Sequence, residues 1–202
     1  MLTIALPKGR IAEETLDKFE KAFGEKFIFE DRKLILEKAG FRFLNVRNQD
    51  VPTYVMHGAA DLGVVGLDVL EEKEYDLIKL LDLKLGRCKV AFGLRAGEEL
   101  DFNKSKITIA TKHEVIAKKF FEQKAMAVEI IKLYGSIELA PLVGLCDCIV
   151  DIVETGETMK QNGLEVGPTI MESSAHLIAN KNSFYAKKDL ILNLKERIEA
   201  HI

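Results

Sequence analysis

The pattern of apolar and polar positions predicts strands and helices that alternate along most of the chain. The β-rich run LTIAL, residues 2–6, is closed by Pro7. Apolar residues then recur at helical spacing from Ile11 to Phe23, and Gly24 is a typical residue to end that helix. The first strand is therefore expected to lead directly into an amphipathic helix.

The rest of the first half is built from shorter pieces. Residues 26–47 alternate in short runs, which predicts strands joined by turns. A helix is expected to open at Asp50 and Pro52, and DLGVVG at 61–66 predicts a buried strand that ends in a glycine. A short helix, LDVLEEKE, follows.

The second half alternates more regularly. The pattern predicts strands at 106–111, 128–134, 148–154, 164–171 and 175–180, and helices at 113–125 and 137–145. The C-terminal segment 187–202 predicts an amphipathic helix with an apolar face of Leu190, Leu194, Ile198 and Ile202. The favoured interpretation is that this face packs on its own lobe; the alternative is that it offers an apolar surface to a partner.

Strand–helix alternation predicts an α/β fold with mostly parallel sheets. The stretch LLDLKLGRCKVAFGL, residues 80–94, holds two strand-like runs joined at Gly86-Arg87, where the chain can cross from one lobe to another. The run at 175–180 is the expected return. We therefore expect a discontinuous lobe I, residues 1–88 plus 178–202, and a lobe II, residues 89–177. No internal repeat is visible in the sequence.

Composition narrows the function classes. The chain has 202 residues, 48% of them hydrophobic and 30% charged, with a formal net charge of −3. No global basic field attracts nucleic acid or a membrane surface, so a bound anion needs a local site. The three cysteines form neither a disulfide framework nor a metal site with enough ligands. Neither a signal peptide nor a membrane span is visible, which predicts a cytoplasmic protein.

One motif places polar chemistry directly after a core strand. Val150–Val153 belongs to a buried strand, and the sequence then continues Glu154-Thr155-Gly156-Glu157-Thr158. A turn between a strand and a helix presents backbone N–H groups to a phosphate, glycine allows close approach, and threonines add hydroxyl donors. Carboxylates accept hydrogen bonds from sugar hydroxyls. The motif therefore fits a ribose 5-phosphate, although a plain surface turn with a capping threonine is an equal alternative at this point.

Three further motifs are candidates for anion binding. Lys8, Gly9 and Arg10 follow the first strand, where cations suit a polyphosphate at the carboxyl edge of an open α/β sheet. Arg32-Lys33 is a second cationic pair. Gly135-Ser136 follows a predicted strand and is expected to open a helix. Taken alone, the two basic motifs are more simply explained as a basic turn and as solvated charge. For Gly135-Ser136, an anion site and an ordinary turn with a serine cap are equal alternatives.

Together these motifs resemble one enzyme family. The segment ELAPLVGLCDCIVDIVETGETM, residues 138–159, resembles the signature segment of ATP phosphoribosyltransferases, which open histidine biosynthesis. LPKGR, RKLIL, DVPTYVMHGAADLGVVGLDVL and KLYGS also match in the same order, so the resemblance covers almost the whole chain. The chain departs from the family pattern at Leu67, Cys146 and Glu157, where a lysine, a small residue, and threonine or asparagine are usual.

The resemblance implies a fold like that of type II periplasmic-binding proteins and a short-form enzyme. Short forms lack the C-terminal regulatory domain and work with a separate regulatory subunit that resembles histidyl-tRNA synthetase. A homodimer is also expected. The implied reaction transfers the phosphoribosyl group of 5-phosphoribosyl 1-diphosphate to N1 of ATP and releases diphosphate.

The resemblance also implies residue roles. The 5-phosphate is expected to bind Thr155, Gly156 and Thr158, and the ribose hydroxyls Asp151 and Glu154. The expected catalytic cations, which bind polyphosphate and the leaving diphosphate, are Lys8, Arg10 and Arg32. Weaker contacts with ATP or diphosphate are expected from Gly9, Lys33, Gly135 and Ser136, with Arg32 and Lys33 reaching a neighbour's site across the dimer. Mg²⁺ is expected to be held through the diphosphate, and no general base is needed.

Three alternatives carry different expectations. A solute-binding protein of similar fold predicts a secretion signal and needs no phosphate loop. The ligand-sensing domain of a transcription regulator predicts a helix-turn-helix segment, whereas residues 1–50 are strand-rich. Another phosphoribosyltransferase, acting on a different base, would share the phosphate loop but would not explain LPKGR and DVPTYV.

Overall fold

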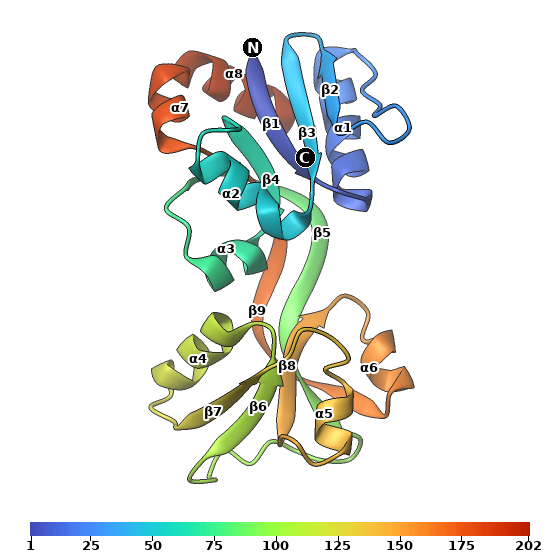
Figure 1. Cartoon of the computed structure of the whole chain (residues 1–202), viewed down its shortest axis with the longest axis vertical. Helices are drawn as coiled ribbons and strands as arrows, with labels where there is room; N and C mark the ends of the chain where they lie inside the picture. Colours follow the sequence, from blue (N-terminus) through green and yellow to red (C-terminus); the bar gives the residue numbers. More distant parts are fainter. The chain divides into compact units, whose positions relative to one another are not determined.

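The computed structural model describes residues 1–202, which divide into two compact units (Figure 1). Unit 1 comprises Met1–Leu70, Glu74–Gly86 and Ser174–Ile202, and unit 2 comprises Glu71–Lys73 and Arg87–Ser173. The expected crossings after residues 88 and 177 lie two and four residues beyond the observed ones after 86 and 173. The grouping of Glu71–Lys73 with unit 2 was not expected, because nothing in that short helical pattern marks a boundary.

Unit 1 is a sheet covered by helices on both faces. Its strands run in the order β2-β3-β1-β4-β9, with β1 parallel to β3 and β4, and β2 and β9 antiparallel to their neighbours. Its elements are β1 (Leu2–Pro7), α1 (Arg10–Phe23), β2 (Ile35–Lys38), β3 (Phe41–Val46), the 3-10 turn η1 (Asn48–Asp50), α2 (Val51–Met56), β4 (Leu62–Gly66), α3 (Leu67–Lys73), the end of β9 (Leu164–Ala179), α7 (Lys181–Ala186) and α8 (Lys188–Glu199).

The C-terminal helix belongs to the core of unit 1. Leu194 and Ile198 of α8 are 2% and 1% exposed and pack in the same cluster as Phe19 and Phe43. Burying these side chains removes apolar area from water and holds α8 on the unit. Packing on its own lobe, the favoured interpretation of this face, is therefore confirmed for Leu194 and Ile198, whereas Leu190 and Ile202 are 56% and 45% exposed.

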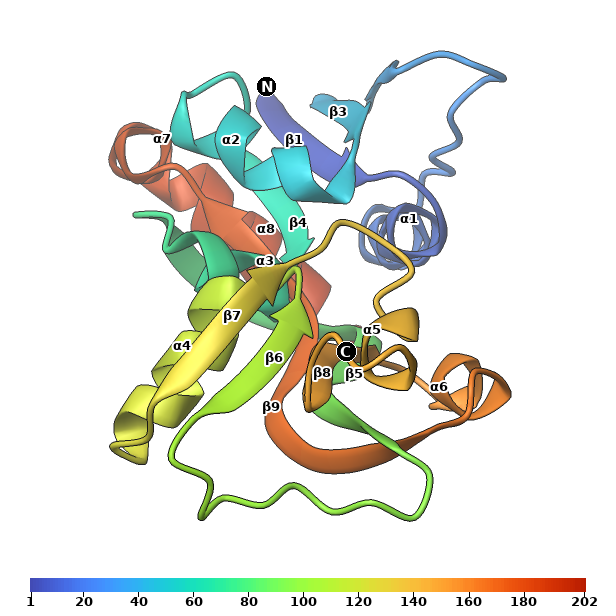
Figure 2. The same cartoon turned by 60° about the horizontal axis from the view of Figure 1, so that its bottom comes forward.

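Unit 2 is a smaller sheet with the strand order β5-β8-β6-β7 (Figures 1 and 2). Strand β6 is parallel to β7 and β8, and β5 is antiparallel to β8. Helix α4 packs on one face, and α5 and α6 pack in a separate core cluster with Ile149 of β8. The elements are the end of β5 (Ile78–Arg95), β6 (Ile107–Thr111), α4 (Glu114–Gln123), β7 (Val128–Lys132), α5 (Leu139–Leu142), β8 (Cys148–Val153), α6 (Glu157–Gln161) and the beginning of β9. The first part of β5, up to Gly86, belongs to unit 1.

The two long strands differ from the expectation of separate shorter ones. Residues 78–95 form one strand through Gly86, and residues 164–179 form one strand through Pro168. Glycine can bend a strand without ending it, and proline is tolerated where no ladder N–H is needed. Residues 25–34 contain no strand, and Asp31 there has a φ of 42°. None of the helices is both long and apolar enough to cross a membrane.

The same hydrogen-bonded arrangement occurs once within each unit, at the amino ends of its strands. In unit 1, Asp61 donates its N–H to the Thr3 carbonyl at 2.8 Å, and its carboxylate accepts the Thr3 N–H at 2.9 Å. In unit 2, Asp147 donates to the Thr108 carbonyl at 2.9 Å and accepts the Thr108 N–H at 2.8 Å. Each aspartate directly precedes a central strand, so we call the pair the aspartate clamps.

Candidate functional site

A pocket of about 390 Å³ lies at the carboxyl end of β8 in unit 2. Its lining includes every residue expected to bind the phosphoribosyl group: Asp151, Glu154, Thr155, Gly156 and Thr158. Glu138, the first residue of the family-like segment, lines it as well. In open α/β sheets, ligands commonly bind at the carboxyl ends of the parallel strands.

The loop after β8 has a conformation that depends on glycine. Gly156 has a φ of 83°, which side-chain-bearing residues adopt at a cost, and a Cβ there would lie 2.9 Å from Val166 Cγ2. The Thr155 hydroxyl accepts the Glu157 N–H at 3.3 Å and closes the turn. Helix α6 spans only Glu157–Gln161, so its macrodipole is small, and the loop itself must supply the donors.

The lining combines three carboxylates with two hydroxyls. When ionised, Asp151, Glu138 and Glu154 can only accept hydrogen bonds, whereas Thr155 and Thr158 can also donate them. Burial opposes ionisation of Asp151, but His113 and Lys112 outweigh it and hold the pKa of that carboxyl below its usual value. The pocket therefore offers ionised acceptors for sugar hydroxyls and loop donors for a phosphate.

Glu157 does not place its charge in the pocket. Its carboxylate accepts a hydrogen bond from the Gln161 side chain at 3.1 Å, along the surface of α6, and it is not among the lining residues. The departure from the family pattern at this position therefore leaves the phosphate end of the loop unobstructed.

Gly135 and Ser136 do not open a helix. Helix α5 begins only at Leu139 and spans four residues, and Ser136 has a φ of 49°, outside the helical region. Neither residue lines the pocket, whereas Glu138, two residues further on, does. The expected strand–helix turn was wrong because the chain makes an irregular turn first.

The basic motif of unit 1 is exposed. Lys8 donates its backbone N–H to the Val46 carbonyl at 2.8 Å, while its side chain faces solvent. Gly9, with a φ of 98°, is the N-cap of α1, and Arg10 Nε lies 3.7 Å from a Glu14 carboxylate oxygen. The motif follows a strand end as expected, but the contact with Glu14 is a weak surface ion pair.

Arg32 and Lys33 lie in the irregular segment before β2, and both are exposed. Lys33 pairs with Glu30, which lowers the pKa of that fully exposed glutamate through a hydrogen bond and charge attraction. The structure therefore does not enclose Lys8, Arg10, Arg32 or Lys33 in one pocket of unit 1.

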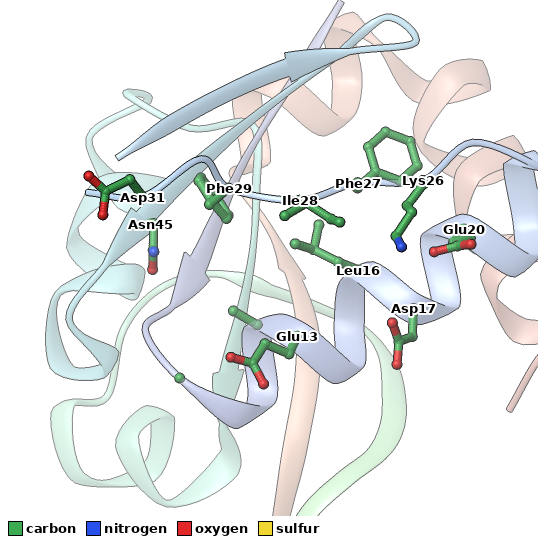
Figure 3. Close-up of a pocket in the computed structure, with 12 residues that line it drawn as sticks. Glu13, Leu16, Asp17, Glu20, Lys26, Phe27, Ile28, Phe29, Asp31 and Asn45 are labelled. Carbon is green, nitrogen blue, oxygen red and sulfur yellow. The ribbon is translucent and has the colours of Figure 1, made fainter. Parts of the chain in front are cut away.

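Unit 1 contains a pocket that the sequence did not indicate. It also measures about 390 Å³, and Gly9 is its only residue from the basic motifs. Figure 3 shows α1 on one side, carrying Glu13, Leu16 and Asp17, and the irregular segment with Phe27 and Ile28 on the other. Four carboxylates and one lysine line it, so its charge does not suit a polyphosphate. Irregular backbone has no sequence period that could have revealed it.

Two residues beside the unit 2 pocket were also missed. Lys112 Nζ lies 3.1 Å from Asp151 Oδ1, and His113 Nε2 lies 3.6 Å from the same oxygen. Both follow β6 as Lys8 follows β1, and this position at a strand end was the available signal. No group of three or more His, Cys, Asp or Glu side chains is arranged to hold a metal ion.

Comparisons with known proteins identify the family of this chain. The family model for ATP phosphoribosyltransferase matches residues 47–200. A relative named ATP phosphoribosyltransferase from Sulfurovum sp. (strain NBC37-1) is 68% identical over 200 residues, covering 99% of this chain and 97% of the relative. One of the same name from Wolinella succinogenes is 69% identical over 197 residues, covering 98% and 96%.

Solved structures show the same fold. The ATP phosphoribosyl transferase (HisG:HisZ) complex from Thermotoga maritima contains a chain with a TM-score of 0.83 and 36% identity, and the alignment covers 99% of this chain and 98% of that one. The substrate-binding protein of an amino acid ABC transporter has a TM-score of 0.60 at 13% identity, covering 98% and 91%. The second likeness concerns the fold alone and corresponds to the expected periplasmic-binding-protein type II architecture.

Proposed function

The chain belongs to the ATP phosphoribosyltransferase family, and we propose how its residues divide the work of that reaction. The activity is transfer of the 5-phosphoribosyl group from phosphoribosyl diphosphate to N1 of ATP, with release of diphosphate, in histidine biosynthesis. The length of 202 residues fits the short form of the family. The observation that carries the residue assignment is the convergence of Asp151, Glu154, Thr155, Gly156 and Thr158 on one pocket.

In this proposal, the unit 2 pocket binds the phosphoribosyl half of the donor. Thr155, Gly156 and Thr158 bind the 5-phosphate through loop N–H groups and hydroxyls, and Asp151 and Glu154 accept hydrogen bonds from the ribose hydroxyls. The anomeric carbon gains positive charge as diphosphate departs. Ionised carboxylates nearby favour that oxocarbenium character, and fixed contacts at both ends of the sugar position it for attack by N1.

Cations of unit 1 are proposed to bind the polyphosphate of ATP and the leaving diphosphate. Lys8 and Arg10 follow β1, and their exposure leaves them accessible to an anionic ligand. Arginine adds a planar fork that can bind two phosphate oxygens at once. Arg32 and Lys33 are proposed to serve the same anions across a homodimer, with weaker support because they lie in an irregular surface segment.

Mg²⁺ is proposed to bind mainly through diphosphate oxygens. The carboxylates of the unit 2 pocket are suitable hard ligands, but the chain does not arrange three of them as a metal-binding group. The ion would neutralise charge on the leaving group, while the protein residues position the sugar.

A regulatory partner is proposed on the basis of one neighbour. The Thermotoga maritima structure is described as a HisG:HisZ complex, and its similar chain covers nearly the full length of this one. We propose that this chain likewise forms a hetero-oligomer with a HisZ-like subunit that resembles histidyl-tRNA synthetase.

One assay tests the function. The chain is incubated with ATP, phosphoribosyl diphosphate and Mg²⁺, with and without the partner subunit, and formation of the N1-ribosylated product is followed by its altered ultraviolet absorbance. Product that requires all three components is expected. Absence of product under both conditions would contradict the proposal and favour a non-catalytic anion-binding protein of the same fold.

A further inference from the structure

A buried histidine beside the phosphoribosyl pocket has no hydrogen bond to either ring nitrogen. His113 is 3% exposed, and neither its Nδ1 nor its Nε2 atom has a hydrogen-bond partner. Leaving a polar group buried and unpaired costs about 1–3 kcal/mol, so native structures rarely retain one without a reason. A phenylalanine or leucine would fill the same space without that cost.

The backbone holds His113 firmly in this position. The His113 N–H donates to the Thr111 hydroxyl at 2.8 Å, and that hydroxyl donates to the Val150 carbonyl of β8 at 2.6 Å. The link connects the end of β6 to the residue before Asp151. The imidazole and the Asp151 carboxylate are therefore positioned by the same two neighbouring strands.

Three donors approach one oxygen of Asp151. The Ile152 N–H lies 2.8 Å from Oδ1, Lys112 Nζ lies 3.1 Å from it, and His113 Nε2 lies 3.6 Å from it. The last distance is longer than a hydrogen bond, so in this structure it is an electrostatic contact. None of these contacts uses Oδ2, which remains available to a substrate hydroxyl.

We propose that His113 is a positioning residue, which holds the Asp151 carboxylate so that its other oxygen meets a ribose hydroxyl of phosphoribosyl diphosphate. A shift of about 0.4 Å would bring Nε2 within hydrogen-bond range of Oδ1. Such a bond forms when the substrate fixes Oδ2. The Nε2-protonated tautomer is the neutral form that can donate it. This inference rests on the proposed function, because it assumes that Asp151 faces the ribose.

Two substitutions separate the proposed contact from the volume of the side chain. His113→Gln places an amide nitrogen near the position of Nε2, whereas His113→Asn places one only near Nδ1. The dissociation constant of phosphoribosyl diphosphate is measured by titration calorimetry on the full chain. His113→Asn is expected to weaken binding about five- to tenfold, and His113→Gln to stay within about twofold of the wild type.

A second background excludes a purely structural effect. In an Asp151→Ala chain, the His113→Asn and His113→Gln variants are expected to bind with equal affinity, because the carboxylate that they would contact is absent. Thermal unfolding of every variant is recorded alongside. A loss of affinity that is the same in both backgrounds would show a structural role and overturn the inference.

The remaining outcomes distinguish the inference from its premise. Equal affinities of wild type, His113→Asn and His113→Gln would overturn the positioning role alone. A wild-type chain that binds neither phosphoribosyl diphosphate nor ribose 5-phosphate would overturn the assignment of the pocket, and the inference with it.

Discussion

The two units have the same hydrogen-bonded arrangement at the amino ends of their central strands, and different residues at the carboxyl ends. In each, an aspartate before a central strand clamps the first residues of its parallel neighbour: Asp61 with Thr3 in unit 1 and Asp147 with Thr108 in unit 2. A lysine completes each clamp, Lys187 in one unit and Lys104 in the other.

The carboxyl ends of the clamped strands diverge. In unit 1, β4 ends at Gly66 and leads into α3, whose Val69 and Leu70 are buried. In unit 2, β8 ends in a loop whose residues Glu154, Thr155, Gly156 and Thr158 line the unit 2 pocket. The amino ends of the strands are therefore alike in the two units, and the proposed difference in binding lies at their carboxyl ends.

The lysines that follow β1 and β6 also differ between the two units. Lys8 follows β1 and Lys112 follows β6; both are exposed, but Lys112 pairs with the pocket residue Asp151. The side chains of the unit 2 pocket therefore converge within one unit, whereas Lys8 and Arg10 line neither of the two larger pockets.

The largest effect is expected at Arg10. Arg10→Ala should lower kcat by about 100-fold or more, the scale for removing one group that stabilises transition-state charge. Arg10→Lys should retain only part of the activity, because it keeps the charge and loses the planar fork. Lys21→Ala, an exposed cation at the other end of α1, is the matched control. Full activity of Arg10→Ala would show that the basic motif after β1 is only a surface turn.

Thr158→Val tests whether the loop of unit 2 binds the 5-phosphate. The substitution removes a hydroxyl with little change in volume, and it should weaken binding of phosphoribosyl diphosphate by about 1–3 kcal/mol, as for hydrogen bonds to charged groups. Thr169→Val, on an exposed part of β9, controls for loss of a threonine elsewhere. Titration calorimetry measures both, and an unchanged affinity for Thr158→Val would remove this residue from the phosphate site.

The clamps should affect stability more than activity. Although burial opposes ionisation of Asp61, Lys187 and the Thr3 N–H hold the pKa of this carboxyl below its usual value. The Asp61 side chain is 10% exposed, compared with 30% for Asp147. Asp61→Asn should therefore cost about 1.5–3 kcal/mol, as for a hydrogen bond to a charged group, and Asp147→Asn should cost less.

The pH dependence of that loss has a definite sign. A carboxyl whose pKa is lower in the folded chain stabilises folding above its unfolded pKa of about 3.9, and this contribution is lost as pH falls through the folded value. The difference in Tm between wild type and Asp61→Asn should shrink below about pH 4. A difference that is constant from pH 7 to pH 3 would show that charge plays no part in the clamp.

The smallest expected effect is that of histidine. In the proposed hetero-oligomer, histidine control is expected to enter through the partner subunit, since coupling needs a second site. Histidine concentrations that inhibit the complex should leave the lone chain almost unchanged. Strong inhibition of the lone chain, by binding away from the active site, would place regulation within these 202 residues.

Most of the fold followed from periodicity, and much of the pocket from residue chemistry. Strand–helix alternation indicated both units, and the acids, threonines and glycine after β8 indicated the loop. The sequence did not reveal His113 or Lys112 as neighbours of Asp151, because their proximity arises from pairing between β6 and β8. It also treated β5 and β9 as pairs of shorter strands, since Gly86 and Pro168 resemble turn signals.

Hydrogen exchange on the full chain, with and without phosphoribosyl diphosphate, tests most directly whether the unit 2 pocket holds the phosphoribosyl group. Amides of residues 152–159 should become protected at saturating ligand, because the phosphate accepts hydrogen bonds from the loop. Protection should be absent when Thr158→Val is tested at a concentration that saturates only the wild type. Ligand-induced protection confined to unit 1, with no change in residues 152–159, would contradict the assignment.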